Sequence, residues 1–90
     1  MNSSYKVEFT REALKALKKL DKPTVIRVIQ AIESLKDNPY EHHQTKKMQG
    51  YSGNIFRLRV GSYRVIYEVI EDELVIIIVK LGPRGGVYKK

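Results

Sequence analysis

The apolar positions of the first 39 residues follow two different periods. Residues 5–9 alternate apolar and charged side chains, which is the two-residue period of a short strand. Apolar residues then recur at helical spacing over residues 11–20 and again over 23–35, so each segment carries one apolar stripe. Thr10 suits the start of the first helix, and the run Asp37-Asn38-Pro39 ends the second. These features predict a strand followed by a helical hairpin.

The rest of the chain predicts an antiparallel meander. Residues 40–54 are mostly polar and are expected to form a loop that can hold a short strand near Met48. Three apolar segments with strand character follow, at 55–60, 63–70 and 74–81. Gly61-Ser62 suits a type II′ hairpin turn, and the acidic run 71–73 makes the next turn. The expected fold class is therefore α+β, with a four-stranded sheet in a single domain spanning residues 1–90.

A two-residue turn at Gly61-Ser62 decides which side chains of this hairpin share a face. Arg59 then pairs with Arg64, and Arg57 lies two residues further along the same face, while the other face is aromatic and aliphatic. Like charges directly opposed across strands destabilise a sheet by a few tenths to ~1 kcal/mol. Such a conflict is more often a functional site than an accident, although each arginine could instead extend to solvent and pair with Glu68.

The next turn extends this face to the last strand. If residues 71–73 form a three-residue turn, Lys80 pairs with Arg64 and joins the arginines, although a one-residue slip would move it to the opposite face. The same register places four isoleucines on this face, namely Ile55, Ile66, Ile76 and Ile78. Basic groups beside exposed aliphatic surface suit a site that an anion and a protein partner occupy in turn.

Composition narrows the classes of partner. The net charge is +7, from 17 Lys+Arg against 10 Asp+Glu, and favours a polyanionic partner, with a solvated surface as the alternative. The absence of cysteine excludes disulfides and thiolate metal sites. The longest aliphatic run, at 74–79, is far shorter than the ~20 residues of a membrane span, and the first residues lack an apolar signal segment. We expect an intracellular, cytoplasmic protein without a bound metal or cofactor.

The stretches FRLRVGSYRVIYEV and KLGPRGGVY, placed after a strand and a helical hairpin, resemble the RelE branch of the RelE/ParE toxin superfamily. These relatives are ribosome-dependent mRNA endonucleases of prokaryotic toxin–antitoxin pairs, and the resemblance covers nearly the whole chain. It implies cleavage of mRNA in the ribosomal A site by metal-independent attack of the substrate 2′-hydroxyl, which inhibits translation. It also implies three partners, namely a cognate RelB-like antitoxin, the ribosome and mRNA, and no membrane.

The resemblance also assigns roles to particular residues. The matched catalytic positions are Arg57, Arg59, Arg64, Arg84 and Tyr88. The candidates for contact with RNA or the ribosome are Lys46, Lys47, Lys80, Lys89 and Lys90. The candidates for antitoxin binding are Ile55, Ile66, Ile76 and Ile78. Tyr88 is the candidate general base, and it could equally stack on an RNA base.

Two other functions stay open from the sequence. One is a ParE-like toxin that inhibits DNA gyrase by binding, with no chemistry of its own. The other is a catalytically weak RNA-binding member, because Arg57 and Arg59 stand where well-known RelE members commonly have lysine. Arginine keeps its proton at all relevant pH values, so neither residue suits a proton donor. His42 and His43 are expected to be surface residues without a catalytic or metal-binding role.

Overall fold

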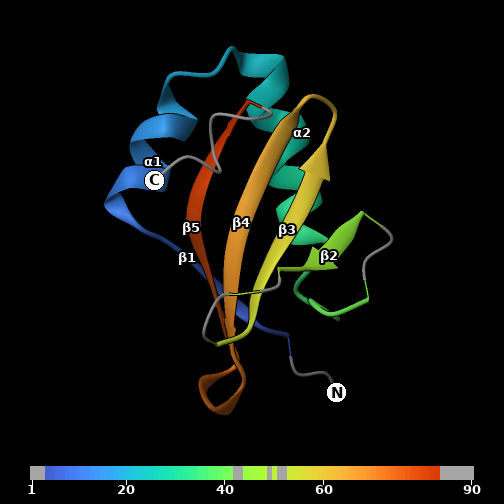
Figure 1. The fold of residues 1–90 in the computed structure, drawn as a ribbon. Helices are drawn as coiled ribbons and strands as arrows, with labels where there is room; N and C mark the ends of the chain where they lie inside the picture. Colours follow the sequence, from blue (N-terminus) through green and yellow to red (C-terminus); the bar gives the residue numbers. More distant parts are fainter. Residues whose placement is uncertain (1–3, 42–43, 49, 51–52, 84–90) are drawn as a thin grey trace.

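The computed structural model describes residues 4–41, 44–48, 50 and 53–83. The elements are β1 (Lys6–Phe9), α1 (Arg11–Lys18), α2 (Lys22–Glu33), β2 (Thr45–Lys47), β3 (Ile55–Val60), β4 (Tyr63–Ile70), a short 3₁₀ turn (Glu71–Glu73) and β5 (Val75–Pro83). They form one sheet in the order β1-β5-β4-β3-β2 (Figure 1). The expected α+β class is confirmed. The sheet has five strands where four were expected, because residues 40–54, expected to form a loop that can hold a short strand near Met48, contain β2, which pairs with β3.

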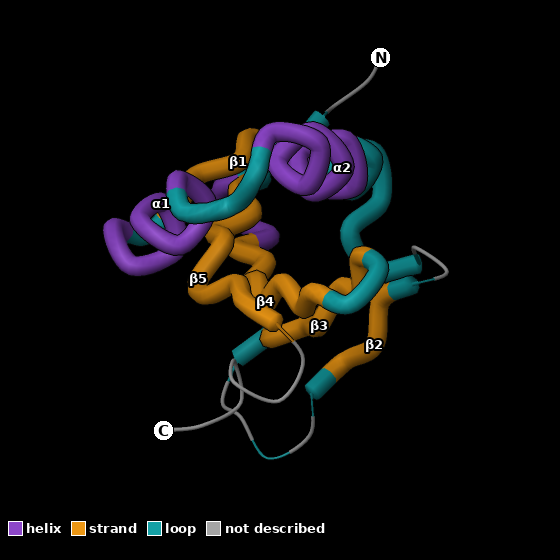
Figure 2. Tube along the Cα trace, turned by 90° about the horizontal axis from the view of Figure 1, so that it is seen from above, coloured by secondary structure: helices purple, strands orange, loops and turns teal. Residues whose placement is uncertain are grey.

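The helical hairpin covers one face of the sheet. Figure 2 shows α1 and α2 on the same side of the strands. Between the two layers lies the core, which is built from apolar residues of the two helices, of the turn after α2 and of β3, β4 and β5. The helices contribute Ala13, Val28 and Ile32, the turn after α2 contributes Leu35, and the strands contribute Phe56, Leu58, Val65, Tyr67, Val69, Ile76, Ile78 and Leu81. The opposite face, which has no described helix over it, is called the open face below.

Thr10 joins the first strand, the first helix and the last strand. The Thr10 amide donates to the Ile78 carbonyl at 3.0 Å, which continues the parallel pairing of β1 with β5. The Thr10 hydroxyl donates to the Val79 carbonyl at 2.8 Å, and its oxygen accepts from the Ala13 amide at 3.1 Å. One hydroxyl therefore caps α1 and also fixes the helix start against β5.

The β3–β4 hairpin has the register expected from the sequence. Val60 pairs with Tyr63 and Arg59 with Arg64, so Gly61 and Ser62 are the two loop residues. Gly61 has a φ of 59°, and Ser62 is not among the described residues with positive φ. This combination is that of a type II′ turn, in which only the first central residue needs the left-handed region. The three arginines consequently share the open face.

The β4–β5 register differs from the expected one. Ile70 pairs with Val75, so the turn contains four residues, and the last of them, Leu74, has a φ of 55°. Because Leu74 is apolar, the sequence analysis predicted it as the first residue of the strand 74–81. The extra turn residue inverts the faces of the first half of β5. The prediction that Ile76 and Ile78 lie on the open face is wrong, because both are 0% exposed in the core beneath the helices.

A bulge restores the expected face for the second half of β5. Tyr67 pairs with Ile78 and Ile66 with Lys80, which leaves Val79 without a partner on β4. Lys80 therefore lies on the open face, as expected, but beside Ile66 rather than opposite Arg64. The extra turn residue and the extra strand residue together shift the register by two positions, which preserves the face of Lys80.

We expect Thr10→Ala to lower the free energy of unfolding by roughly 2 kcal/mol, because it removes the helix cap and the bond to the Val79 carbonyl together. Thr10→Ser keeps the hydroxyl and should retain most of that stability. Urea unfolding followed by circular dichroism measures both variants. Equal losses in the two variants would assign the effect to the methyl group rather than to the hydroxyl.

Candidate functional site

Five cations gather on the open face at the end of the sheet nearest the β3–β4 turn. They come from four different strands, β2 to β5, and are called the cationic cluster: Lys46, Arg57, Arg59, Arg64 and Lys80. Two rows of paired residues position them. One row runs Lys46, Arg57, Ile66, Lys80, and the other runs Arg59, Arg64, Gly82. Because pairing fixes the backbone under every member, the cluster follows from the sheet itself.

Two arginines of the cluster are held by polar neighbours. Arg64 is only 8% exposed, and its Nη1 donates to the Tyr63 carbonyl at 3.2 Å. Arg59 is exposed, and its Nε donates to the Gln44 side-chain oxygen at 3.2 Å. The Arg59 amide also donates to the Gln44 carbonyl at 3.0 Å. Each guanidinium retains further N–H donors for a ligand.

Arg57 has an unsatisfied donor. Its Nε is buried and has no hydrogen-bond partner, although the residue as a whole is half-buried. A buried N–H without an acceptor costs free energy, and a charged one costs more. Among the described residues the only ion pair joins Lys36 to Glu33, at 3.0 Å, so no carboxylate pairs with the arginines, Glu68 included. The cluster therefore offers donors and positive charge to an anion supplied from outside.

The open face changes character away from the cluster. Ile66, at 6% exposure, lies within the row of Lys46, Arg57 and Lys80, and Ile55 lies one row further from the β3–β4 turn, opposite Glu68. Glu68 in turn pairs with Ile77, which pairs with Glu8 on β1. The face is therefore cationic at one end and mixed aliphatic and acidic at the other. This distribution of charge favours the binding of a polyanion at the cationic end of the face.

The structure adds two residues that sequence analysis missed. Arg27 reaches from α2 to the β3–β4 turn, where its Nη2 lies 3.1 Å from the position that a Cβ on Gly61 would take. Gln44 directs its side chain to Arg59. Arg27 lies outside the apolar stripe of its helix, and no sequence signal predicted its contact with the turn. Gln44 could have been found by extending the β3 register into the preceding loop.

Lys47 lies on the other side of β2 from Lys46. It pairs with Phe56, and its Nζ lies 5.8 Å from the centroid of the Phe56 ring and 3.4 Å from the Asn54 side-chain oxygen. Lys47 therefore does not join the cationic cluster. Several candidate residues lie outside the described part of the chain, namely Arg84, Tyr88, Lys89, Lys90, His42 and His43.

Tyr67 fastens β2 and the preceding loop to the sheet. Its hydroxyl donates to the Pro39 carbonyl at 2.6 Å and is hydrogen-bonded to the Thr45 hydroxyl at 3.0 Å. Burial raises the pKa of Tyr67 to about 12, while the bond to Thr45 acts in the opposite direction. Thr45 precedes Lys46 in β2. The bond between the Tyr67 and Thr45 hydroxyls therefore helps to hold Lys46 in position at the edge of the cationic cluster.

Two further classes of site were searched for within the described residues. No helix there is long and apolar enough to cross a membrane. No group of three or more His, Asp or Glu in that part of the chain could hold a metal ion.

Comparison with known proteins places the chain in a family. Residues 7–88 match the family described as the ParE toxin of type II toxin-antitoxin system, parDE. The chain is 38% identical over 87 residues to a Methanocaldococcus jannaschii protein named as toxin RelE1, covering 94% of this chain and 96% of that protein. An Escherichia coli RelE-like toxin protein is 33% identical over 81 residues, covering 89% and 83% respectively. The chain belongs to the ParE toxin family of type II toxin–antitoxin systems.

Solved structures narrow the class within that family. RelE in the RelE–RelB complex of Pyrococcus horikoshii OT3 matches with a TM-score of 0.80 and 33% identity, over 94% of this chain and 100% of that chain. The Methanococcus jannaschii RelB–RelE complex matches with a TM-score of 0.69 and 28% identity, over 86% and 90%. The intact Escherichia coli RelBE complex, at 22% identity and a TM-score of 0.79 over 89% and 96%, shares the fold. This chain is a RelE-type toxin of a RelBE toxin–antitoxin system, which confirms the resemblance drawn from the sequence.

The raised pKa of Tyr67 predicts a loss of stability at alkaline pH. Unfolded tyrosine ionises near pH 10, so the contribution of Tyr67 is complete below that pH and disappears as pH rises through about 12. We expect the stability advantage of the wild type over Tyr67→Phe to shrink by roughly 2–3 kcal/mol across this range. Urea unfolding of both proteins at a series of pH values from 8 to 12 measures the difference in their free energies of unfolding. The other titrating groups are common to both proteins, so their contributions cancel in this difference. A constant difference would show that Tyr67 ionises normally in the folded protein.

Proposed function

We propose that this toxin cleaves mRNA in the ribosomal A site and so inhibits translation. The observation that supports this most directly is the convergence of five cations around a buried, unpartnered Arg57 Nε on one end of the open face. Such a site suits a phosphate, because guanidinium groups bind phosphate oxygens in a bidentate manner. The antitoxin partner proposed for this chain is a RelB-like protein, since its structural relatives were solved as RelE–RelB complexes.

The proposed reaction uses the substrate's own 2′-hydroxyl. This oxygen loses its proton to a base and attacks the adjacent phosphorus, while the bond from phosphorus to the 5′-oxygen breaks. The leaving 5′-oxygen takes up a proton, and the upstream RNA ends in a 2′,3′-cyclic phosphate. Negative charge on the non-bridging oxygens increases in the transition state, and fixed cations stabilise it.

Each cluster residue has a distinct place in this proposal. Arg57, which is half-buried, supplies its charge and its terminal N–H groups to the scissile phosphate, and Arg64, oriented by the Tyr63 carbonyl, holds a second oxygen. Arg59 is more exposed and is assigned to the adjoining phosphate. The resemblance further suggests Arg84 as a contact for the phosphate or the leaving oxygen and Tyr88 as the general base. Nearby guanidinium groups would favour the tyrosinate that such a base requires.

A second candidate function follows from the family to which the chain is matched, whose description is that of the ParE toxin. A toxin of that type would act by binding DNA gyrase, without cleaving a substrate. Convergent arginines that pair with no carboxylate among the described residues favour the nuclease, because burying a charge in a protein interface has a cost unless the charge is paired. The two functions differ in their product, since only the nuclease leaves a cut mRNA.

We expect purified toxin to cut a defined mRNA within the A-site codon of programmed ribosomes that have a vacant A site. Arg57→Ala should lower the cleavage rate by about 100-fold or more, because it removes fixed charge stabilisation of the transition state. Arg57→Lys keeps the charge without the bidentate geometry and should fall between the two. Primer extension maps and quantifies the RNA ends.

Lys18→Ala is the matched control, since Lys18 is an exposed cation on α1 outside the cluster. It should cleave at the wild-type rate. Arg84→Ala and Tyr88→Phe test the two roles taken from the resemblance, and full activity in Tyr88→Phe would remove the base assignment. Intact mRNA with every protein, together with inhibited supercoiling by gyrase, would favour the second candidate. Intact mRNA with undiminished RNA binding would identify a catalytically weak member.

A further inference from the structure

The open face carries, beside the cationic cluster, a carboxylate that the proposed reaction does not use. Glu68 lies on β4 in the row next to that of Arg57, between Ile55 on β3 and Ile77 on β5. Its two neighbours along β4 are buried in the core, so the Glu68 side chain belongs to the open face. Arg57 and Glu68 are diagonal neighbours across β3 and β4, a relation in which two residues lie about 7–8 Å apart.

Glu68 and Arg57 do not pair with each other, although long side chains can meet over this separation. No ion pair or hydrogen bond engages the Glu68 carboxylate within the part of the chain that the structure describes. Its Oε2 lies 3.2 Å from the position that a Cβ on Gly53 would take. Gly53 precedes β3, so the carboxylate is directed away from the cationic cluster. The arginine donors and the carboxylate acceptor therefore stand apart on one face.

Donors and an acceptor separated in this way match the two ends of a nucleotide. Phosphate oxygens accept hydrogen bonds and suit the cationic cluster, whereas an ionised carboxylate needs N–H donors, which a base supplies on its Watson–Crick edge. Ile55 and Ile77, both half-buried, offer apolar surface to the ring on either side of Glu68. Since Glu68 repels a second phosphate, a base is favoured over the RNA backbone in this row.

We propose that Glu68 recognises the base next to the scissile phosphate and favours guanine over uracil. Guanine presents two adjacent donors, N1–H and the 2-amino group, which can donate one hydrogen bond to each carboxylate oxygen. Adenine and cytosine present one amino group beside a ring acceptor, and uracil presents one N–H between two carbonyl oxygens that the carboxylate repels. The inference rests on the proposed function, because the cationic cluster must hold the phosphate of the same RNA.

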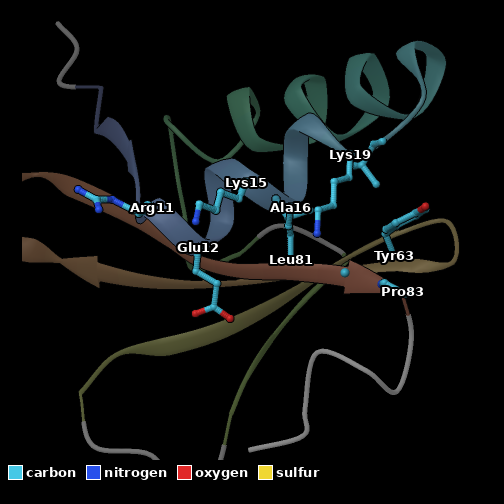
Figure 3. Close-up of a pocket in the computed structure, with 10 residues that line it drawn as sticks. Arg11, Glu12, Lys15, Ala16, Lys19, Tyr63, Leu81 and Pro83 are labelled. Carbon is cyan, nitrogen blue, oxygen red and sulfur yellow. The ribbon is translucent and has the colours of Figure 1, made fainter.

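A groove between α1 and the C-terminal half of β5 is a less suitable site for this base. Its volume is about 680 Å³, which is in the range of protein ligand sites. Figure 3 shows residues that line it, among them Lys15, Lys19, Tyr63, Leu81 and Pro83. Leu81 belongs to the core beneath the helices, so the groove opens away from the open face. A base whose phosphate lies at the cationic cluster therefore reaches Glu68 more directly than it reaches the groove.

Glu68→Gln tests the proposal, because it replaces one acceptor oxygen by a donor while keeping the size of the side chain. An amide matches the edge of uracil better than the two donors of guanine. On programmed ribosomes whose vacant A-site codons differ only in guanine or uracil at one position, the wild type should cleave the guanine codon about tenfold faster or more. In Glu68→Gln this preference should disappear, because uracil codons are cut faster and guanine codons more slowly. Primer extension measures both rates.

Glu8→Gln is the matched control. Glu8 is exposed and lies in the same row, on β1 beyond Ile77, so the substitution changes the net charge equally on the far side of the sheet from β3. It should keep the guanine preference of the wild type. Thermal unfolding verifies that both variants are folded.

A binding measurement separates this inference from the nuclease reaction. The probes are a 2′-O-methyl hexauridylate and the same oligonucleotide with one central guanine, and neither has a 2′-hydroxyl that could attack the phosphate. Fluorescence anisotropy should show that the wild type binds the guanine probe about tenfold more tightly or more. Glu68→Gln should bind the two probes equally, and Glu8→Gln should behave as the wild type.

The two assays distinguish failure of the inference from failure of the proposed function. A guanine preference seen in either assay and lost only in Glu68→Gln supports recognition by Glu68. Equal slowing of both codons in Glu68→Gln, with the preference kept, would assign Glu68 a general structural or electrostatic role and overturn the inference, as would equal losses of preference in both variants. Cleavage and binding without base preference in the wild type would overturn it as well. Selective binding without cleavage would refute the nuclease alone.

Discussion

The register of β4 against its two neighbours decides which side chains reach each face of the sheet. On the β3 side, a two-residue turn with Gly61 at positive φ places Arg59 opposite Arg64. On the β5 side, a four-residue turn places Ile76 and Ile78 in the core, and a bulge at Val79 returns Lys80 to the open face. Both the helix-covered core and the cationic cluster depend on these three features, because a slip of one residue exchanges the faces.

The cationic cluster opposes the stability of the fold that carries it. Arg59 and Arg64 are directly opposed, the Arg57 Nε is buried without an acceptor, and no carboxylate in the described part of the chain pairs with them. The sheet tolerates this because its other face is covered by two helices and a continuous apolar core. A bound phosphate would offset the repulsion between the opposed cations, so the same arrangement that weakens the free protein strengthens its interaction with an anion.

The cationic cluster and the groove between α1 and β5 lie on different surfaces. Both include or adjoin residues at the start of β4 and the end of β5. Gly82 pairs with Arg64 and lines the groove, and Tyr63 lines the groove while its carbonyl holds Arg64.

The sequence by itself determined the helices, four of the five strands and the face of the three arginines, because periodicity and a two-residue Gly-Ser turn are local properties. It also identified the RelE-type toxin, through the order of its strand and turn motifs. Only the tertiary structure decided the faces of Ile76 and Ile78, since Leu74 is apolar yet occupies the turn, and no local pattern marks the bulge at Val79. The tertiary structure alone also decided the contact of Arg27 with the β3–β4 turn and the groove between α1 and β5, because each forms where segments distant in the chain meet. The periodicity of one segment carries no information on which segment packs beside it.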